Sequence, residues 1–529
     1  MVGLGTMGRN FLLNVAEHGF ACAGYDIDPE KREMLRADAG ELPISVAESP
    51  AELVKTLATP RSIMVLVPAG PIVDAVITAH LPHLDKGDLI IDGGNSHFVD
   101  TERREGYLTA KGIGFLGVGI SGGEEGARFG PSIMPGGRRD YYGRIAPIFE
   151  AVSAKVNGEP CVAYMGAGSA GHFVKMVHNG IEYGLMEILA ETYDFMLRVV
   201  RMNYSEMAET FAQWNSSELN SFLVEITAEV LRKVDSETGR PLVDVILDKA
   251  AQKGTGNWTC EAAIEYGVPV PTIDSAVTMR QISAQKEVRV LIAQKIGCKT
   301  FPGPEQVAVD GQKVTSEAET GPKAALAAQA HETRASVHHS RFAESKKDDG
   351  SLSTGPLTKS EDIRSEFEAD RSASLEQLRN ALLSSFIVTY AQGLSLLQVA
   401  SEAKKYGLDL AEIARIWRGG CIIRSALLDK MRAAFAEDPQ LPNLILNDEF
   451  ASILVKNCPD WHEIVGKFSQ SRIPSLCLSS GISYFEAFRS ERLPANLIQA
   501  QRDFFGAHTY QRTDKEGIFH TPDWSEPRK

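Results

Sequence analysis

The chain has 529 residues, of which 43% are hydrophobic, and this length exceeds what a single core requires, so we expect two or more domains. Its formal charge of −14 and pI near 5.5 disfavour binding to a nucleic-acid backbone, because such binding needs a large basic face. We expect a cytoplasmic location and no membrane partner, because no apolar run approaches the roughly 20 residues of a membrane span, the N-terminus has no signal-type segment, and the seven scattered cysteines contain no CxxC.

The first segment, MVGLGTMG, places glycines in the order Gly3-x-Gly5-x-x-Gly8 between a short apolar stretch and the helix-like run FLLNVAEHGF. This strand–turn–helix order is typical of dinucleotide-binding domains, where glycines let the backbone approach a pyrophosphate at a helix N-terminus. A plain glycine-rich turn is the alternative. The phosphate site is favoured because further strands are predicted at residues 21–26, 63–68 and 89–93. The chain starts almost inside its first strand, so we expect that a few upstream residues are missing from this sequence.

Asp26 follows the second predicted strand. A carboxylate there can accept hydrogen bonds from the adenosine ribose hydroxyls and repel a 2′-phosphate, which favours NAD over NADP. Against this, Lys31 and Arg32 are near enough in sequence to offer countercharge, and an Asp at a strand end can simply cap a turn. The sequence therefore favours NAD without excluding NADP.

Two glycine-rich segments, residues 92–96 (DGGNS) and 117–137, are predicted as loops that carry Asn95 and Ser121. Such loops can bind hydroxyl and carboxylate groups through backbone N–H groups, or they can be no more than tight turns. They follow successive strands of one predicted sheet, and open α/β sheets bind ligands at the carboxyl ends of their strands. We therefore expect a ligand site at this edge.

Lys175, His178, Asn179 and Glu182 lie in the run KMVHNGIE at spacings of three, four and seven, which places them on one face of a predicted helix. The intervening apolar residues can bury on other faces, so an amine and a carboxylate project together as an acid–base pair. Taken alone, such a stripe is more often a solvated Lys/Glu face. The catalytic interpretation therefore depends on the rest of the chain.

From residue 171 onward strand signals fade and apolar residues recur at helical spacing, which predicts a large all-α domain. Residues 252–258 (QKGTGNW) are predicted as a loop suited to holding a phosphate, with Lys253 and Thr255 as its polar groups. Arg280, Arg502 and His508 are further candidate cations, although each alone is more often a surface charge. Residues near 308–372 are poor in large apolar side chains and predict a flexible insertion.

In this combination the chain resembles 6-phosphogluconate dehydrogenase, the decarboxylating enzyme of the pentose phosphate pathway. The resemblance covers nearly everything except the insertion. It rests on GLGTMGRN at 3–10, DGGNS at 92–96, GISGGEEGARFGPSIMPGG at 119–137, GHFVKMVHNGIEYG at 171–184, ILDKAAQKGTGNW at 246–258, WRGGCIIRS at 417–425 and RDFFGAHTY at 502–510. It implies an α/β plus all-α protein: a Rossmann-type parallel-sheet domain at 1–168, an all-helical substrate and dimerisation domain at 169–490, and a C-terminal tail at 491–529 that reaches into the partner subunit.

The resemblance also implies the reaction, which is oxidative decarboxylation of 6-phospho-D-gluconate to D-ribulose 5-phosphate and CO2 with reduction of NADP or NAD and without a metal. Lys175 would be the general base and then an acid, and Glu182 the general acid. The implied substrate contacts are Asn95, Ser121, Gly122, Gly123, His178, Asn179, Tyr183, Lys253, Thr255, Arg280, Arg502 and His508. The expected cofactor contacts are Gly3, Gly5, Thr6, Met7, Gly8, Asp26, Val67, Ala69 and Asn95. Since Arg502 and His508 would come from the other subunit of a homodimer, a monomer should be nearly inactive.

The chain departs from the family pattern at two places. Most members use NADP and carry Asn-Arg-Thr or similar after the second strand, where this chain has Asp26, Ile27 and Asp28. Without that Arg, both a stack on the adenine and a charge pair with the 2′-phosphate are lost. We therefore expect NAD use or dual specificity. The other departure is the insertion, which we expect to be peripheral.

Two other functions are weighed against this one. A related β-hydroxyacid dehydrogenase acting on a non-phosphorylated acid would not need Lys253, Arg280 and Arg502. A non-enzymatic nucleotide-binding scaffold would be expected to lose Lys175 or Glu182, and both are present.

Overall fold

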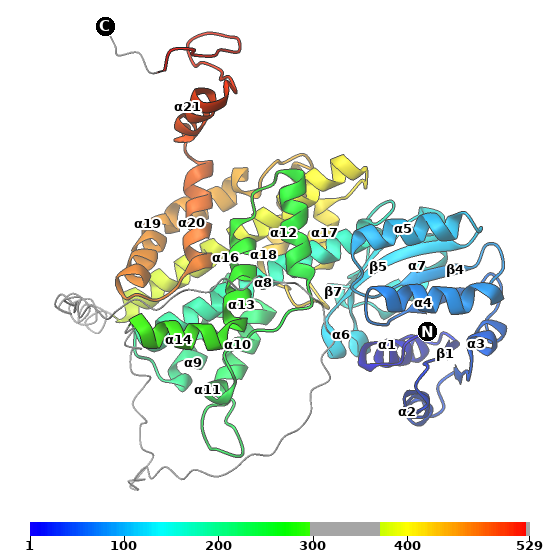
Figure 1. Ribbon diagram of the computed structural model, residues 1–529. Helices are drawn as coiled ribbons and strands as arrows, with labels where there is room; N and C mark the ends of the chain where they lie inside the picture. The colour runs from blue at the N-terminus through cyan, green and yellow to red at the C-terminus, as the bar shows by residue number, and fades with distance from the viewer. Residues whose placement is uncertain (297–370, 525–529) are drawn as a thin grey trace, which may run out of the picture.

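An α/β unit formed by the N-terminal part of the chain packs against a larger helical body (Figure 1). The structure, a computed structural model, describes residues 1–296 and 371–524. The predicted α/β plus all-α fold is confirmed. The predicted insertion near 308–372 lies outside the described residues apart from its last two, which belong to a helix.

The α/β unit is built on a mainly parallel sheet. Its strands are β1 (Cys22–Gly24), β2 (Ile44–Val46), β3 (Ser62–Val65), β4 (Leu89–Asp92), β5 (Gly114–Ser121) and β6 (Ser132–Gly137). β3, β4 and β5 pair in parallel and β6 is antiparallel to β5. Val2 makes parallel bridges to both Tyr25 and Val65, and so joins the parallel β1–β2 pair to β3. All residues of β4 and β5 are buried, as expected for central strands covered on both faces.

Helices cover both faces of this sheet, and several begin with local capping signals. They are α1 (Thr6–Glu17), α2 (Pro29–Ala39), α3 (Pro50–Thr56), α4 (Pro71–His80), α5 (Phe98–Thr109), α6 (Gly123–Phe129) and α7 (Arg139–Val152). Asp28 caps α2 by accepting a hydrogen bond from the Glu30 backbone N–H. α1 instead has Gly5 as its N-cap, so no side chain caps its first N–H groups.

The structure corrects the predicted loop at residues 117–137. Most of this segment is regular: it forms the end of β5, then α6, then β6, so only short connections remain around Gly122 and Gly130. Both glycines have positive φ values, 114° and 138°, which explains why the composition resembles that of a loop. The predicted strands at 21–26, 63–68 and 89–93 are present but shorter, because the chain turns out of the sheet toward the ligand edge.

A short hairpin of β7 (Lys155–Val156) and β8 (Glu159–Pro160) precedes the helical body. The body contains α8 (Ala170–Arg198), α9 (Tyr204–Trp214), α10 (Phe222–Arg232), α11 (Leu242–Val245), α12 (Thr255–Tyr266), α13 (Pro271–Ala284), α14 (Lys286–Ile296), α16 (Arg371–Lys404), α17 (Leu410–Ile416), α18 (Leu427–Glu437), α19 (Asp448–Gln470) and α20 (Leu476–Phe488). α8 and α16 form its centre. They approach closely because Gly393 faces Ile181 and Gly184 faces Thr389, where a Cβ would lie 2.5 and 2.6 Å from the opposing side chain.

α16 differs from one sequence expectation. Among the described residues, it is the helix that is long and apolar enough to cross a membrane by length and composition, although the sequence was expected to hold no such run. Its most apolar stretch is 83% buried inside the protein. Such a helix is apolar all round because other helices surround it, so α16 is explained as a core helix.

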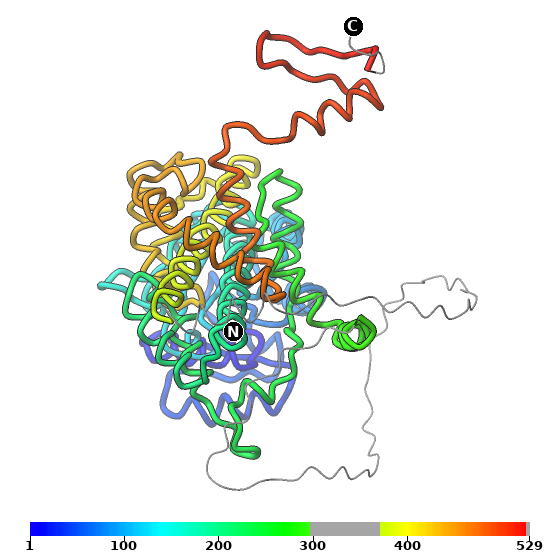
Figure 2. Tube along the Cα trace, turned by 90° about the vertical axis from the view of Figure 1, so that its left-hand side faces the viewer, coloured from blue at the N-terminus to red at the C-terminus, as the bar shows by residue number. Residues whose placement is uncertain are grey.

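The last helix, α21 (Ala495–Gly506), leaves the helical body with the C-terminal tail and contacts it little (Figures 1 and 2). Asp503 is the buried residue of α21. Its carboxylate accepts hydrogen bonds from the Thr509 and Thr521 backbone N–H groups and from the Trp524 indole, all at 2.9 Å. The tail is therefore folded around this carboxylate rather than against the rest of its own chain.

Candidate active site

Glycines in the sheet allow α8 to lie directly against β5 and β6. A Cβ at Gly117 would lie 2.8 Å from the His172 ring, and one at Gly136 would lie 2.2 Å from the Gly171 backbone N. Side chains at these positions would push the helix away from the sheet. This contact fixes the first half of α8 beside the carboxyl ends of β4 and β5, where a ligand site was predicted.

Lys175 is 6% exposed, and its amine is surrounded by polar groups from two elements. Nζ donates to Asn179 Oδ1 at 2.7 Å and to Ser121 Oγ at 3.3 Å, and it lies 3.4 Å from His178 Nδ1. Burial lowers the pKa of Lys175, and the nearby Glu182 carboxylate opposes that shift. The amine is therefore more readily neutral than a surface lysine, as a base must be.

His178 and Glu182 complete the polar face of α8. The His178 ring is fully buried against Trp417, and its Nε2 lies 3.3 Å from Ser121 Oγ. Burial, with the positive charge of Lys175, holds the pKa of His178 well below its usual value, so the ring is neutral. The Glu182 side chain is 21% exposed, with Oε2 3.8 Å from His178 Nδ1. Burial raises the pKa of Glu182, so this carboxyl keeps its proton to a higher pH than an exposed glutamate.

The predicted phosphate loop at residues 252–258 is only partly a loop, because α12 begins at Thr255. Gly254, with φ 92°, turns the chain into that helix, and Thr255 occupies its first turn. Asn179 Nδ2 donates to Thr255 Oγ1 at 3.1 Å, which joins α12 to the polar face of α8. The Arg280 guanidinium lies 3.6 Å from the centre of the Tyr183 ring and donates to the Ala251 carbonyl at 3.0 Å. Thr255 is therefore linked to Lys175 through Asn179, and Arg280 reaches the same helix at Tyr183.

A cleft of about 680 Å³ opens at the carboxyl edge of the sheet next to this group. Most of the predicted cofactor contacts line it. They are Gly5, Thr6, Met7, Gly8, Val67, Ala69 and Asn95, joined by Lys253 from the helical body. Lys253 therefore reaches the cleft from the segment that leads into α12.

The glycine-rich turn has the close approach that a dinucleotide requires. Gly3 has φ 92°, and a Cβ at Gly8 would lie 1.9 Å from the Gly3 carbonyl oxygen, so a side chain would break the turn. Gly5 and the first residues of α1 line the cleft beside it, which suits a pyrophosphate at a helix N-terminus. The residues present therefore fit the phosphate groups of a dinucleotide.

Asp26 is buried, and both of its carboxylate oxygens accept backbone hydrogen bonds. Oδ2 accepts from the Leu4 N–H at 2.7 Å and Oδ1 from the Asp28 N–H at 2.9 Å. The turn-cap alternative therefore describes part of its role, although each oxygen keeps a further lone pair for a ribose hydroxyl. Ile27 beside it is 86% exposed.

Sequence reasoning missed the residues that hold the Asn95 loop. The buried Asp92 accepts hydrogen bonds from Ser96 Oγ at 2.7 Å and from Arg104 Nη1 at 3.3 Å. Arg104 is 1% exposed and also bonds Asp74 on α4. Asp92 could have been found from the sequence because it belongs to the DGGNS motif. The contact of Arg104 with this loop could not, because it depends on where α5 packs.

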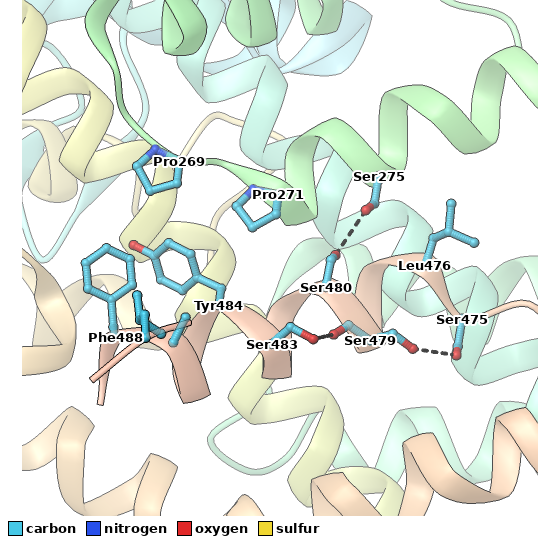
Figure 3. A pocket seen from close by; sticks show the side chains of 12 residues that line it. Pro269, Pro271, Ser275, Ser475, Leu476, Ser479, Ser480, Ser483, Tyr484 and Phe488 are labelled. Atoms are coloured by element: carbon cyan, nitrogen blue, oxygen red, sulfur yellow. Dashed lines mark hydrogen bonds between the residues drawn. The ribbon is translucent and has the colours of Figure 1, made fainter. Parts of the chain in front are cut away.

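The structure does not bring every predicted residue into the site. Arg502 and His508 lie on α21 and just after it, away from Lys175 of the same chain (Figure 1). A second cavity, of about 920 Å³, lies between α13 and α20 (Figure 3). It is lined by prolines, serines and apolar side chains, and it contains none of the predicted site residues.

A dinucleotide cleft beside a buried amine of lowered pKa and a carboxyl of raised pKa defines a nicotinamide-dependent dehydrogenase with acid–base side chains. Residues 1–166 match the family model of the NAD binding domain of 6-phosphogluconate dehydrogenase, and residues 171–330 and 309–524 match the C-terminal domain of that enzyme. The chain belongs to the 6-phosphogluconate dehydrogenase family and is a decarboxylating oxidoreductase. The predicted family is confirmed.

Individual relatives agree with this assignment. The NADP(+)-dependent, decarboxylating 6-phosphogluconate dehydrogenase of Bacillus subtilis is 42% identical over 98% of both chains. The decarboxylating enzyme of Treponema pallidum is 44% identical over 98% of this chain and 95% of that protein. The solved structure of Plasmodium falciparum 6-phosphogluconate dehydrogenase, described in apo form and in complexes with NADP+ and with 6-phosphogluconate, is 37% identical with a TM-score of 0.83, covering 98% of this chain and 99% of that one.

Proposed function

We propose that the chain converts 6-phospho-D-gluconate to D-ribulose 5-phosphate and CO2, with Lys175 as general base and Glu182 as general acid. One observation carries the proposal: a buried amine of lowered pKa and a carboxyl of raised pKa lie on one face of α8, beside the dinucleotide cleft. The shifts bring both groups nearer to neutral pH, where acid–base catalysis is most effective.

In the first step, neutral Lys175 removes the proton of the substrate 3-hydroxyl as the hydrogen on C3 departs as hydride. The bound nicotinamide dinucleotide supplies the hydride acceptor. Asn179 and Ser121 hold Nζ in place from two sides, so the lone pair has a fixed direction. The product of this step is a 3-keto acid with the carboxylate at C1 in the β position.

In the second step, protonated Lys175 gives its proton to the C3 oxygen as the C1–C2 bond breaks and CO2 leaves. The electron pair of that bond becomes the C2–C3 double bond of an enediol. Glu182 then protonates the former C2, while Lys175 takes back the proton of the enol oxygen, which yields the ketone of ribulose 5-phosphate. One proton therefore shuttles on Lys175, and one is delivered by Glu182.

The remaining predicted residues form two groups, according to the part of the substrate that each would bind. Asn95, Ser121, the Gly122 and Gly123 backbone, His178 and Asn179 would bind the hydroxyls and carboxylate of the sugar acid. Tyr183, Lys253, Thr255 and Arg280 would bind its phosphate, because they combine cations with hydroxyl donors. The contact of Thr255 with Asn179 and that of Arg280 with Tyr183 support this division, because both attach phosphate-binding groups to α8.

For the dinucleotide, the proposed contacts are those that line the cleft, with Gly3 in the turn behind it. We propose that NAD is used at least as well as NADP, because the buried Asp26 carboxylate would face a 2′-phosphate and the exposed Ile27 offers it no charge. Lys31 and Arg32 are the nearby cations, and both are already engaged: Lys31 lies 3.9 Å from the Asp26 carboxylate, and Arg32 donates to the Asp26 carbonyl at 2.7 Å. The Bacillus subtilis relative is NADP(+)-dependent by name, so this preference would distinguish the chain from it.

The working unit is proposed to be a homodimer in the cytoplasm, with residues 1–168, 169–490 and 491–529 as its three segments. The tail supports this, because α21 carries large apolar side chains that its own chain leaves exposed. They are Leu497, Ile498, Phe504 and Phe505, which are between 60% and 72% exposed. A partner that covers them would also receive Arg502 from this helix and His508 from the residues just after it.

Replacement of Lys175 by Met tests the central assignment. The variant should lose reduction of the dinucleotide while still binding it, because the glycine-rich turn is separate from α8. Glu182→Gln should still form CO2 and reduced dinucleotide but should release ribulose 5-phosphate slowly, since only the protonation step is impaired. Near-normal turnover by Lys175→Met would remove the proposal.

A further inference from the structure

A second group of side chains with metal-binding chemistry lies where α19 packs against α20, on the side of the helical body away from the α/β unit (Figure 1). Cys458 and His462 are four residues apart on one face of α19, and Glu486 faces them from α20. The thiol, imidazole and carboxylate donor atoms all lie within 4.8 Å of one another. None of these residues takes part in the proposed reaction.

We propose that Cys458, His462 and Glu486 bind one Zn²⁺ ion, with water as the fourth ligand. Zinc prefers this set of thiolate, imidazole and carboxylate, and its usual bond lengths place ligand atoms about 3.3–3.8 Å apart in a tetrahedral site. Glu486 Oε1 already lies 3.3 Å from Cys458 Sγ and 2.7 Å from His462 Nε2. Zinc would replace the hydrogen bond between Glu486 and His462, and these two side chains would move apart to ligand spacing.

The site is open to solvent on one side. Cys458 would bind zinc as the thiolate, so zinc binding releases one proton. The His462 side chain is 55% exposed, which gives the ion and the released proton a route to solvent.

Arg489 is the competitor for this site. It donates to both oxygens of Glu486, at 2.6 and 2.8 Å, but its side chain is 48% exposed. Exposed Arg–carboxylate pairs are weak, so a divalent ion with three ligands can displace the guanidinium into water. Since Glu486 lies near the end of α20, zinc would also link the end of that helix to α19.

Full-length protein freed of metal, then dialysed with ZnCl2 or CoCl2, tests the site. We expect one bound ion per chain at this site, a thiolate-to-cobalt charge-transfer band in the near ultraviolet, and a thermal midpoint that rises with zinc concentration. His462→Ala, at an exposed position, and the near-isosteric Cys458→Ser should lose these signals. Cys22→Ser and His83→Ala, outside the cluster, should retain them. A cobalt spectrum without the thiolate band, or an unchanged band in Cys458→Ser, would overturn the proposal.

Arg489→Gln provides a test in the opposite direction. Removal of the competing guanidinium should tighten zinc binding severalfold, measured by competition with a chromophoric chelator. Unchanged or weaker binding would show that Glu486 is not a ligand and would overturn the three-ligand site.

Discussion

Gly119 on β5 faces Lys175 on α8 so closely that a Cβ on Gly119 would lie 2.4 Å from Lys175 Cβ. The absence of a side chain at one residue therefore sets the position of the amine at the other. Gly119 is also followed within two residues by Ser121, which accepts a hydrogen bond from that amine. One strand thus makes room for the base and also orients it.

Gly119→Ala should lower kcat by about 100-fold, because a displacement of the base by about 1 Å is enough to misalign proton transfer. Dinucleotide affinity should change little, since the glycine-rich turn is remote from this contact. Steady-state rates of dinucleotide reduction and a binding titration would measure the two effects. Gly143→Ala, at a glycine with open space around it, is the matched control and should remain fully active.

Lys175 and Glu182 should affect different rates as the pH changes. At low pH the rate of dinucleotide reduction falls because Lys175 becomes protonated, and its lowered pKa moves that limb to a more acid pH than an ordinary lysine would give. At high pH the release of ribulose 5-phosphate slows because Glu182 loses its proton, and its raised pKa moves that limb upward. Initial rates across a buffer series would define both limbs. A rate that keeps rising into acid would contradict these assignments.

The cofactor preference can be altered at two adjacent residues. Wild-type protein should show kcat/KM with NAD equal to or above that with NADP. Replacing Asp26 by Asn together with Ile27 by Arg should move the ratio toward NADP by about tenfold or more, because a guanidinium can pair with the 2′-phosphate. Ile27→Gln is the control without charge. A wild-type preference for NADP would show that the Asp26 argument is wrong.

Shared active sites can be tested by mixing two inactive variants. Lys175→Met and Arg502→Ala homodimers should each be nearly inactive. When both are unfolded and refolded together, a heterodimer contains one site with Lys175 from one chain and Arg502 from the other, so roughly a quarter of wild-type activity should return. Refolding each variant alone is the control. If the mixture stays inactive although heterodimers form, Arg502 does not act across a subunit interface.

Much of the fold and site could be predicted from local patterns. The glycine-rich turn, the helical spacing of Lys175, His178, Asn179 and Glu182, and the apolar period of α16 each depend on neighbours within two helical turns, so the sequence contains them directly. Residues 117–137 were wrongly predicted as a loop from their glycine content. These glycines serve tight packing and positive φ values within regular structure, and composition does not distinguish such glycines from those of a loop.

Other features depended on which elements pack together. Spacing alone left open whether Lys175 and Glu182 were solvated, and only burial between the sheet, α12 and α16 shifts their pKa values in opposite directions. The support of the Asn95 loop by Arg104 and the meeting of Cys458 and His462 with Glu486 have no local signal, because their partners belong to elements distant along the chain. The sequence determined which chemical groups the protein carries. Tertiary packing decided which of them are in contact, how far each is buried from solvent and which protonation state each favours.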